Sequence, residues 1–482
     1  MLAKILFVVI MRDNSHFITW GGMSVRRWQL VYNRWLNRKL TKIGTTRLIA
    51  IAFAVIILAG TLLLMTPAAS RSGLPCSFRG ALFTATSATC VTGLTLFDTW
   101  SQWSGFGQAV ILTLIEIGGL GFMSAASVFV FLLRRRVGMK QRLVMAQALS
   151  VEDLSGVVKL QKLVLKGSLS IQGIGALILM LRFLPDVGLR RAFCWGIFHS
   201  VSAFCNAGFD IMGVFTPGSS IMAYNTDFVV CLTLMALVIL GGLGFFVWEE
   251  VARVRCFKKL SVYTRLVLII SGCLLLFGMI SFALLEWNNP GTLGGMAWHH
   301  KLLNAAFQSV TVRTAGFISF DQGAMTDAAK AVSTILMLIG GSSGSTAGGM
   351  KTVTILVMIL FLWARLRGRE TVTVFKKTIP NSQVLDALTI AAVMLGLALF
   401  GGIFISATSG FGFTDALYES ASAIATVGLS AAGTANMSIP AQYLIILYMY
   451  FGRVGVLTIA LGFLEDRKTE RFRYAETKLM IG

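Results

Sequence analysis

Ser87-Ala88-Thr89-Cys90-Val91-Thr92-Gly93-Leu94 is a short stretch that the chain repeats in similar form three more times. The related stretches contain Gly208, Gly316 and Gly428, and the one around Gly316 is a residue shorter. Successive glycines are 115, 108 and 112 residues apart, and an aromatic residue precedes each of them by nine or ten positions. A repeat of this length indicates four copies of one structural unit.

The composition of the 482-residue chain is that of a membrane protein, with 56% hydrophobic and 13% charged residues. Many apolar runs reach about 20 residues, the length that crosses roughly 30 Å of hydrocarbon. The net charge of +21 is concentrated in basic blocks between these runs. That is the positive-inside pattern of polytopic membrane proteins, and it argues against nucleic acid as the partner. The seven cysteines show no Cys-x-x-Cys spacing, so we expect buried small residues rather than disulfides or metal ligands.

Each repeat contains an apolar span, a short segment leading into the glycine stretch, a second span and a basic block. The short segments cannot cross a bilayer, so we expect re-entrant helices that line a cavity or are buried in protein. We expect first spans at 47–66, 163–183, 266–286 and 384–407, re-entrant helices at 80–89, 192–204, 299–311 and 413–425, and second spans at 105–133, 227–249, 330–363 and 441–463.

The basic blocks give all four repeats the same orientation, with both termini in the cytoplasm. This predicts an all-α polytopic protein with eight transmembrane helices and four re-entrant loops around a pseudo-fourfold pore. Inverted repeats, which many carriers use, would alternate in orientation. The predicted parts are a cytoplasmic basic arm (1–46), pore repeats at 47–142, 143–265, 266–380 and 381–466, and a basic tail (467–482).

The four glycine stretches are the predicted selectivity filter. Rings of backbone carbonyls can replace the water shell of a cation, and glycine tolerates the backbone dihedrals that turn carbonyls inward. The negative C-terminal ends of the re-entrant helices would also favour a cation. Glycines that only permit close helix packing are the alternative. The predicted filter residues are Cys90, Val91, Thr92, Gly93, Cys205, Asn206, Ala207, Gly208, Arg313, Thr314, Ala315, Gly316, Ala425, Thr426, Val427 and Gly428.

Several charged residues lie close to these stretches. Asp98, Asp210 and Asp321 follow three of the four glycines by two to five residues. They either concentrate cations at the outer mouth or are ordinary solvated loop acids. Glu116 lies within an apolar span, where it either faces the cavity or pairs with a basic group.

The second span of the third repeat is interrupted by a polar, glycine-rich run. Each glycine in a helix costs up to about 1 kcal/mol relative to alanine, so we expect a broken helix in the cavity beneath the filter. This predicted gate consists of Gly340, Gly341, Ser342, Ser343, Gly344, Ser345, Thr346, Ala347, Gly348 and Gly349.

Arg453 in the last span completes the predicted gate. An intramembrane arginine defaults to a functional role, here a positive barrier under the filter with carbonyls of the glycine-rich run as candidate partners. A snorkelling or structurally paired arginine is the alternative.

With these four stretches and the sequences Ile117–Phe122 and Leu240–Phe245, residues 47–482 resemble the Trk/Ktr/HKT family of potassium transporters, most closely the Ktr-type pore subunit. The resemblance implies potassium uptake across the bacterial cytoplasmic (inner) membrane, with glycine in all four loops favouring K⁺ and residues 340–349 as an intramembrane gating loop. It also implies a homodimer in membrane lipid, on a cytoplasmic ring of nucleotide-binding regulatory subunits (KtrA-like). No covalent cofactor is expected, and Na⁺ is a candidate activator.

Two other classes of protein were weighed against this interpretation. A coupled cation symporter would need acidic residues in several spans, and Glu116 is nearly alone there. A membrane-embedded enzyme would need a set of catalytic side chains. The chain has four histidines and no visible Ser/His/Asp or metal-ligand set, so no enzymatic activity is predicted.

Overall fold

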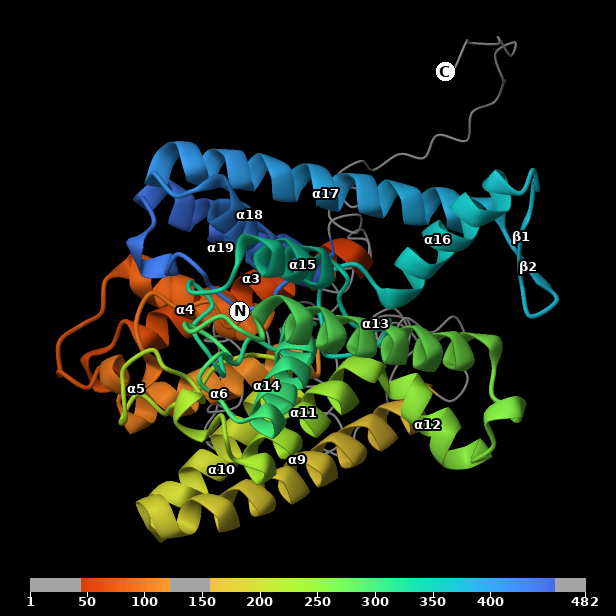
Figure 1. The fold of residues 1–482 in the computed structure, drawn as a ribbon. Helices are drawn as coiled ribbons and strands as arrows, with labels where there is room; N and C mark the ends of the chain where they lie inside the picture. Colours follow the sequence, from red (N-terminus) through yellow and green to blue (C-terminus); the bar gives the residue numbers. More distant parts are fainter. Residues whose placement is uncertain (1–44, 122–156, 456–482) are drawn as a thin grey trace, which may run out of the picture. The chain divides into compact units, whose positions relative to one another are not determined.

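The computed structural model describes residues 45–121 and 157–455. The chain divides into two compact units, residues 1–48 and 49–482, and the second is described here. The predicted arm, the tail, the basic block around Arg134 and the ends of the spans 105–133 and 441–463 lie largely outside the described residues. Within these limits the unit is almost entirely helical (Figure 1).

The helices follow the predicted order of long, short and long segments. The first helices of the four repeats are α3 (Thr45–Leu64), α9 (Val157–Val187), α13 (Val262–Glu286) and α17 (Asn381–Ser409). The short helices are α4 (Phe78–Cys90), α10 (Leu189–Phe204), α14 (Trp298–Thr311) and α18 (Phe413–Ile424). Their bounds agree with the predicted re-entrant segments within three residues.

The second helical segment of each repeat begins at a side-chain cap. These segments are α6 (Gly105–Gly119), α11 (Phe228–Leu243) with α12 (Phe245–Val254), α15 (Asp327–Leu338) with α16 (Thr352–Leu366), and α19 (Ile439–Val454). Ser104, Asp227, Thr326 and Ser438 each accept a hydrogen bond from a first-turn backbone amide, which satisfies donors that a helix leaves free.

The apolar helices fit a bilayer by length and composition. Among the described residues, α9 from Gln161 onward, α13 and α17 are long and apolar enough to cross a membrane, and α11 with α12 makes a fourth if counted as one bent span. Residues 49–64, α6 and α16 are apolar but shorter. The prediction of eight spans therefore stays a prediction.

Two local predictions about the second half of the repeats were wrong. The predicted span 227–249 is bent by 96° between α11 and α12, where Gly244 has a φ of +92° that a helix cannot contain. The class all-α also omitted a small antiparallel hairpin, β1 (Val372–Val374) and β2 (Lys377–Ile379), that follows α16.

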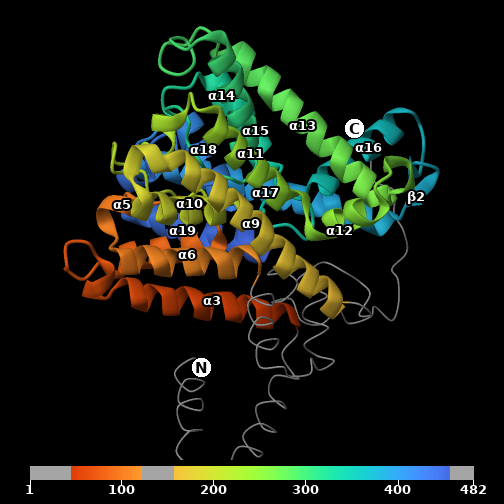
Figure 2. The ribbon, with the colours of Figure 1, turned by 90° about the horizontal axis from the view of Figure 1, so that it is seen from below.

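The short helices pack in a closed cyclic order. Each contacts the second helix of the preceding repeat: α10 contacts α6, α14 contacts α11, α18 contacts α15, and α4 contacts α19. Figures 1 and 2 show α10 alongside α9, and α18 alongside α17, with which they also pack. The last contact of the cycle joins the first repeat to the fourth, so the C-terminal ends of the short helices converge.

Glycines allow this convergence. A Cβ atom placed on Gly118, Gly241 or Gly452 would lie 1.9, 2.0 or 2.2 Å from the carbonyl oxygen of Thr89, Phe204 or Ile424 respectively. Each of these carbonyls belongs to the last turn of a short helix or directly follows it. These three helix glycines therefore permit close packing of the second helices on the short helices.

Candidate functional site

Four glycine loops share one unusual backbone conformation. We call them loop 1 (Cys90–Gly93), loop 2 (Cys205–Gly208), loop 3 (Arg313–Gly316) and loop 4 (Ala425–Gly428). The glycines have φ values of +95°, +68°, +82° and +97° in this order. The residue two positions earlier is left-handed in each loop, at Val91, Asn206, Thr314 and Thr426, with φ between +54° and +68°. Left-handed residues other than glycine cost energy and cluster at functional sites.

The loops meet in a closed ring. A Cβ atom on Gly93 would lie 2.5 Å from the carbonyl oxygen of Ala207, and one on Gly208 would lie 2.8 Å from that of Ala315. A Cβ on Gly316 would lie 2.5 Å from the carbonyl oxygen of Val427. The cycle closes at Gly428, whose Cβ would lie 2.2 Å from the carbonyl oxygen of Thr92. Each glycine thus faces a backbone carbonyl of the next loop, and no larger residue fits without displacing that carbonyl.

Hydroxyl groups on the short helices hold the loops in place. The Gly93 amide donates to Ser87 Oγ at 3.0 Å, and the Gly428 amide donates to Ser422 Oγ at 3.1 Å. In loops 2 and 3 the hydroxyls of Ser202 and Thr311 instead donate to the carbonyl oxygens of Phe209 and Phe317. Sequence reasoning did not assign these roles, although Ser87, Ser202 and Ser422 recur six residues before a glycine.

A polar cavity lies directly outside the ring. It measures about 360 Å³ and is lined by all four loop glycines together with Asp98, Asp210 and Asp321. The three acids thus line the same cavity as the ring. The prediction that they concentrate cations at the mouth of the filter requires this position. They also bind loop backbone: Asp98 accepts from the amides of Ser101 and Gly218, Asp210 from Met212 and Asp321 from Gly323.

Asp210 differs from an ordinary surface acid. It lies between α10 and α11, and burial raises the pKa of its carboxyl group to about 6, with a smaller contribution from the Asp98 carboxylate. Its negative charge is therefore present above about pH 6 and is lost as the pH falls through that value.

A buried carboxylate missed by sequence reasoning holds the segment after loop 4. Glu419 of α18 is fully buried and accepts from Ser430 Oγ at 2.5 Å and from the amides of Ala431 and Ala432 at 3.0 and 3.1 Å. Thr434 Oγ1 also donates to it. Glu419 belongs to a short helix and not to a predicted span, so it does not change the statement that Glu116 is nearly alone in the spans. These contacts of Glu419 all fix the segment that follows loop 4.

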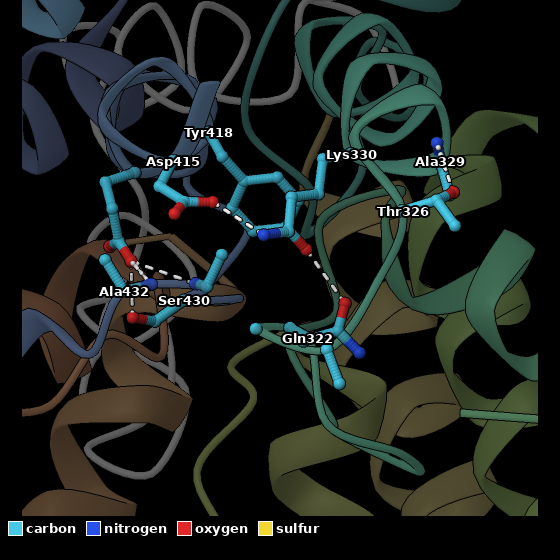
Figure 3. Close-up of polar contacts among 12 residues, drawn as sticks. Gln322, Thr326, Ala329, Lys330, Asp415, Tyr418, Ser430 and Ala432 are labelled. Atoms are coloured by element: carbon cyan, nitrogen blue, oxygen red, sulfur yellow. Dashed lines mark hydrogen bonds and ion pairs between the residues drawn. The ribbon is translucent and has the colours of Figure 1, made fainter. Parts of the chain in front are cut away.

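Further polar contacts join the third and fourth repeats. Figure 3 shows Tyr418 donating to Gln322 Oε1 at 2.8 Å and Lys330 paired with Asp415 at 2.8 Å. Ser430 and Ala432 lie on the other side of this group. These contacts fix the rim of the cavity beside loops 3 and 4.

The glycine-rich run lies on the opposite side of the ring. Residues 339–351 connect α15 to α16 without a helix, as predicted. The Ser342 and Thr346 amides donate to the carbonyl oxygens of Gly242 and Gly241, and Gly344 accepts from the Phe245 amide. A Cβ on Gly348 would lie 2.0 Å from Thr426 Oγ1, so this segment also touches loop 4. The residues around the bend between α11 and α12 are therefore hydrogen-bonded to the glycine-rich run.

Arg453 joins this segment to another repeat. Its guanidinium donates to the carbonyl oxygens of Thr346 in the glycine-rich segment and of Gly118 at the end of α6, and to that of Gly119 at 3.0 Å. The contact with the glycine-rich run was among the predicted partners of Arg453, and the contacts with α6 were not. A snorkelling arginine would not make these contacts, whereas a structurally paired arginine, the other form of the alternative, is compatible with them.

Two other charged residues flank the ring. Glu116 of α6 accepts from Gln172 Nε2 at 3.1 Å and from Cys205 Sγ at 3.4 Å, and has no ion pair among the described residues. Arg313 of loop 3 has its side chain beside α11 and α13, against Ile239 and Leu275. The sixteen predicted filter residues therefore come together in backbone, but the Arg313 side chain points away from the outer cavity.

Comparison with known proteins identifies relatives over nearly the whole chain. Residues 45–471 match the family model TrkH, described as a cation transport protein. The potassium/sodium uptake protein NtpJ of Enterococcus hirae is 38% identical over 92% of this chain and 99% of its own length. The Ktr system potassium uptake protein B is 37% identical in Bacillus subtilis and 36% identical in Vibrio alginolyticus, each over 92% of this chain and over 98% and 97% of the relative.

A solved structure has the same fold. The potassium transporter TrkH from Vibrio parahaemolyticus superimposes with a TM-score of 0.68, covering 88% of this chain and 85% of that one. At 18% sequence identity this similarity is one of fold alone.

Proposed function

The chain belongs to the TrkH family of cation transport proteins, and we propose that it takes up K⁺ across the bacterial cytoplasmic membrane through a gated, channel-like pore. The observation that carries the proposal is the closed ring of four glycine loops beneath a cavity with three acids. The names of the relatives NtpJ and Ktr system protein B, which give potassium or potassium and sodium as the ions taken up, support K⁺ as the substrate.

In this proposal a hydrated cation first enters the outer cavity, where Asp98, Asp210 and Asp321 raise its local concentration. It then exchanges water for the carbonyl oxygens of Thr92, Ala207, Ala315 and Val427, which face the loop glycines around the ring. The C-terminal ends of four short helices add partial negative charge at the same point. No buried carboxylate is needed in the ring itself, so the ion is not held too tightly to leave.

Residues 340–349 and Arg453 form the gate in this proposal. The segment contacts loop 4 at Gly348 and is held through Thr346 by the guanidinium of Arg453. A fixed positive charge at that depth opposes the passage of a cation, and a segment without helical structure can move with less cost than a packed helix. Opening would displace the segment and free the path beneath the ring.

We further propose that the chain works as a homodimer in membrane lipid with a cytoplasmic nucleotide-binding regulatory subunit. Support comes from relatives named as components of a Ktr system. The exposed basic residues near the hairpin, including Arg367 and Arg369, offer a docking face on the side that the positive-inside pattern assigns to the cytoplasm. Na⁺ remains a candidate activator, since the name of the E. hirae relative includes sodium.

A coupled cation symporter is the second candidate function. Glu116, a carboxylate in an apolar helix hydrogen-bonded to loop 2 at Cys205, is the observation that favours it. In a symporter this carboxylate would exchange a proton or bind a second cation during each cycle.

Rubidium uptake by purified chain in liposomes separates the two candidates. The proposal predicts uptake driven by the rubidium gradient alone, with equal Na⁺ on both sides of the membrane and with a protonophore present, and a strong reduction by competing K⁺. Uptake that requires a Na⁺ or proton gradient and is abolished by Glu116→Gln would instead establish the symporter.

A further inference from the structure

Arg313 is the only charged residue among the sixteen residues of the four loops. A guanidinium aimed at the axis of a cation filter would repel the permeating ion. The side chain instead lines a small cavity of about 30 Å³ between α11 and α13, among Val238, Ile239 and Leu275. A charged side chain with such apolar neighbours is costly at membrane depth, so its contacts require a functional explanation.

The polar contact of this side chain is with the glycine-rich segment. Arg313 Nη2 donates to the carbonyl oxygen of Gly340 at 3.4 Å, and Gly341 lines the same cavity. Its Nε is buried and has no hydrogen-bond partner among the described residues. Gly340 is the second residue after α15. Loop 3 therefore reaches the point where the segment begins.

The equivalent positions of the other loops are small. They are Cys90, Cys205 and Ala425, each three residues before its glycine. Cys205 packs against Gly119 of the preceding repeat, and a Cβ on that glycine would lie 2.6 Å from its sulfur. Arg313 lines the same small cavity as Gly242, the matching glycine of α11. Its longer side chain reaches the segment at the Gly340 carbonyl oxygen.

We propose that Arg313 is a positioning residue that couples loop 3 to the gate by holding the start of the glycine-rich segment. Arg453 holds the middle of the same segment at Thr346, from the fourth repeat. The segment is thus held by two arginines from different repeats. Opening must break the bond between Arg313 and Gly340 or move loop 3 with the segment. This inference rests on the proposed function of the segment as a gate.

A double-mutant cycle tests the proposal in the full chain. Rubidium uptake into liposomes is compared for wild type, Arg313→Gln, a deletion of residues 342–348 and the combination of both. Arg313→Gln alone should raise uptake about fivefold, as expected for losing one long hydrogen bond to a charged group. In the deletion background the same substitution should change nothing, and Arg313→Lys should restore part of the wild-type closure.

Lys301→Gln is the matched control. Lys301 is another buried cation of the third repeat, but it donates to the Trp287 carbonyl oxygen, away from the segment. Its substitution should leave uptake unchanged, and size-exclusion profiles identify any variant that fails to fold.

The possible outcomes distinguish failure of the proposed role of Arg313 from failure of the proposed gate. A rise or a fall of equal size in both backgrounds would overturn the inference, because Arg313 would then act without the segment. A deletion that raises uptake while Arg313→Gln has no effect would overturn the inference and leave the gate intact. If the deletion alone changes nothing, the proposed gate fails, and the inference fails with it.

Discussion

The ring of glycine loops and the helix ends beneath it differ in how far the four repeats are alike. In the ring each loop has a left-handed residue two positions before a glycine with positive φ, and each glycine faces a carbonyl of the next loop. Beneath it, α6 stops at Gly119, α11 bends at Gly244, and α15 and α16 are separated by residues 339–351. In α19, Arg453 lies one residue after the glycine that packs on α18.

This difference suggests that the proposed filter needs four similar loops, whereas the proposed gate does not need four similar helix ends. An ion coordinated by four loops at once needs equivalent ligands, so a change in one loop affects the whole ring. Control of passage needs only one obstruction, so a single repeat can carry the segment and another its arginine. Substitution of a loop glycine in any of the four repeats should therefore change ion selectivity. Substitutions in the helix ends beneath the ring should change ion flux, and only in the repeats that carry the glycine-rich segment or Arg453.

The largest effect is expected for Gly428→Ser in the ring. The new Cβ would lie 2.2 Å from the Thr92 carbonyl oxygen at a residue with a φ of +97°, so this carbonyl, which the proposal assigns to ion coordination, must move. Discrimination of K⁺ over Na⁺ in rubidium competition should fall by about tenfold or more, equivalent to roughly 1.4 kcal/mol.

Gly73→Ala is the matched control for this substitution. Gly73 also has a positive φ, +72°, but a Cβ there meets nothing within 4 Å. The variant should keep its ion preference. Unaltered competition in Gly428→Ser would mean that the ring is not the selective element.

The next effect is expected for deletion of residues 342–348, which removes the segment between α15 and α16 that touches loop 4. Rubidium flux should rise about tenfold or more while ion preference stays close to wild type, because the ring is not altered. A loss of selectivity with unchanged flux would contradict the assignment of selectivity to the ring and of gating to the glycine-rich segment.

Arg453→Gln should have a smaller effect in the same direction. It removes hydrogen bonds to three carbonyl oxygens, those of Thr346, Gly118 and Gly119, and one positive charge. A hydrogen bond contributes about 1 kcal/mol on average, which predicts a rise in flux of about fivefold if the loss of one bond limits opening.

Arg182→Gln provides the comparison for Arg453→Gln. Arg182 pairs with Asp186 and Asp227, and neither of these carboxylates belongs to the glycine-rich segment. Equal fluxes in the two variants would remove Arg453 from the gate.

The smallest effect is expected at the outer cavity. Because the pKa of Asp210 is raised to about 6, wild-type uptake at low ionic strength should decline as the pH falls through 6 and the carboxylate is neutralised. Asp210→Asn should reduce uptake about two- to threefold above that pH and flatten the pH profile. A profile that is the same in both proteins would assign Asp210 to loop structure alone.

The sequence predicted the short helices well because an aromatic residue and a glycine recur around each of them. It did not predict the bend at Gly244, since the residues on both sides of that glycine are apolar and a continuous span was the simpler expectation. A signal was present, because the same five residues, Gly-Gly-Leu-Gly-Phe, occur at 118–122 and 241–245. The structure ends α6 and α11 within this motif.

The side-chain roles were harder to predict, because they depend on contacts between repeats. Arg453 was identified as an intramembrane charge, but its contacts with Gly118 and Gly119 join residues more than 330 positions apart. Glu419 was assigned no role, and Arg313 was predicted only as part of the filter. A charge within a short polar helix or loop carries no sequence pattern that separates it from a solvated one. Only the packing around them gives their partners.

The most direct test of the ring is crystallography of the protein in rubidium. The account predicts an anomalous difference peak on the axis of the four loops, surrounded by the carbonyl oxygens of Thr92, Ala207, Ala315 and Val427, that is lost when rubidium is replaced by sodium. Rubidium peaks elsewhere in the protein with none inside the ring would contradict it.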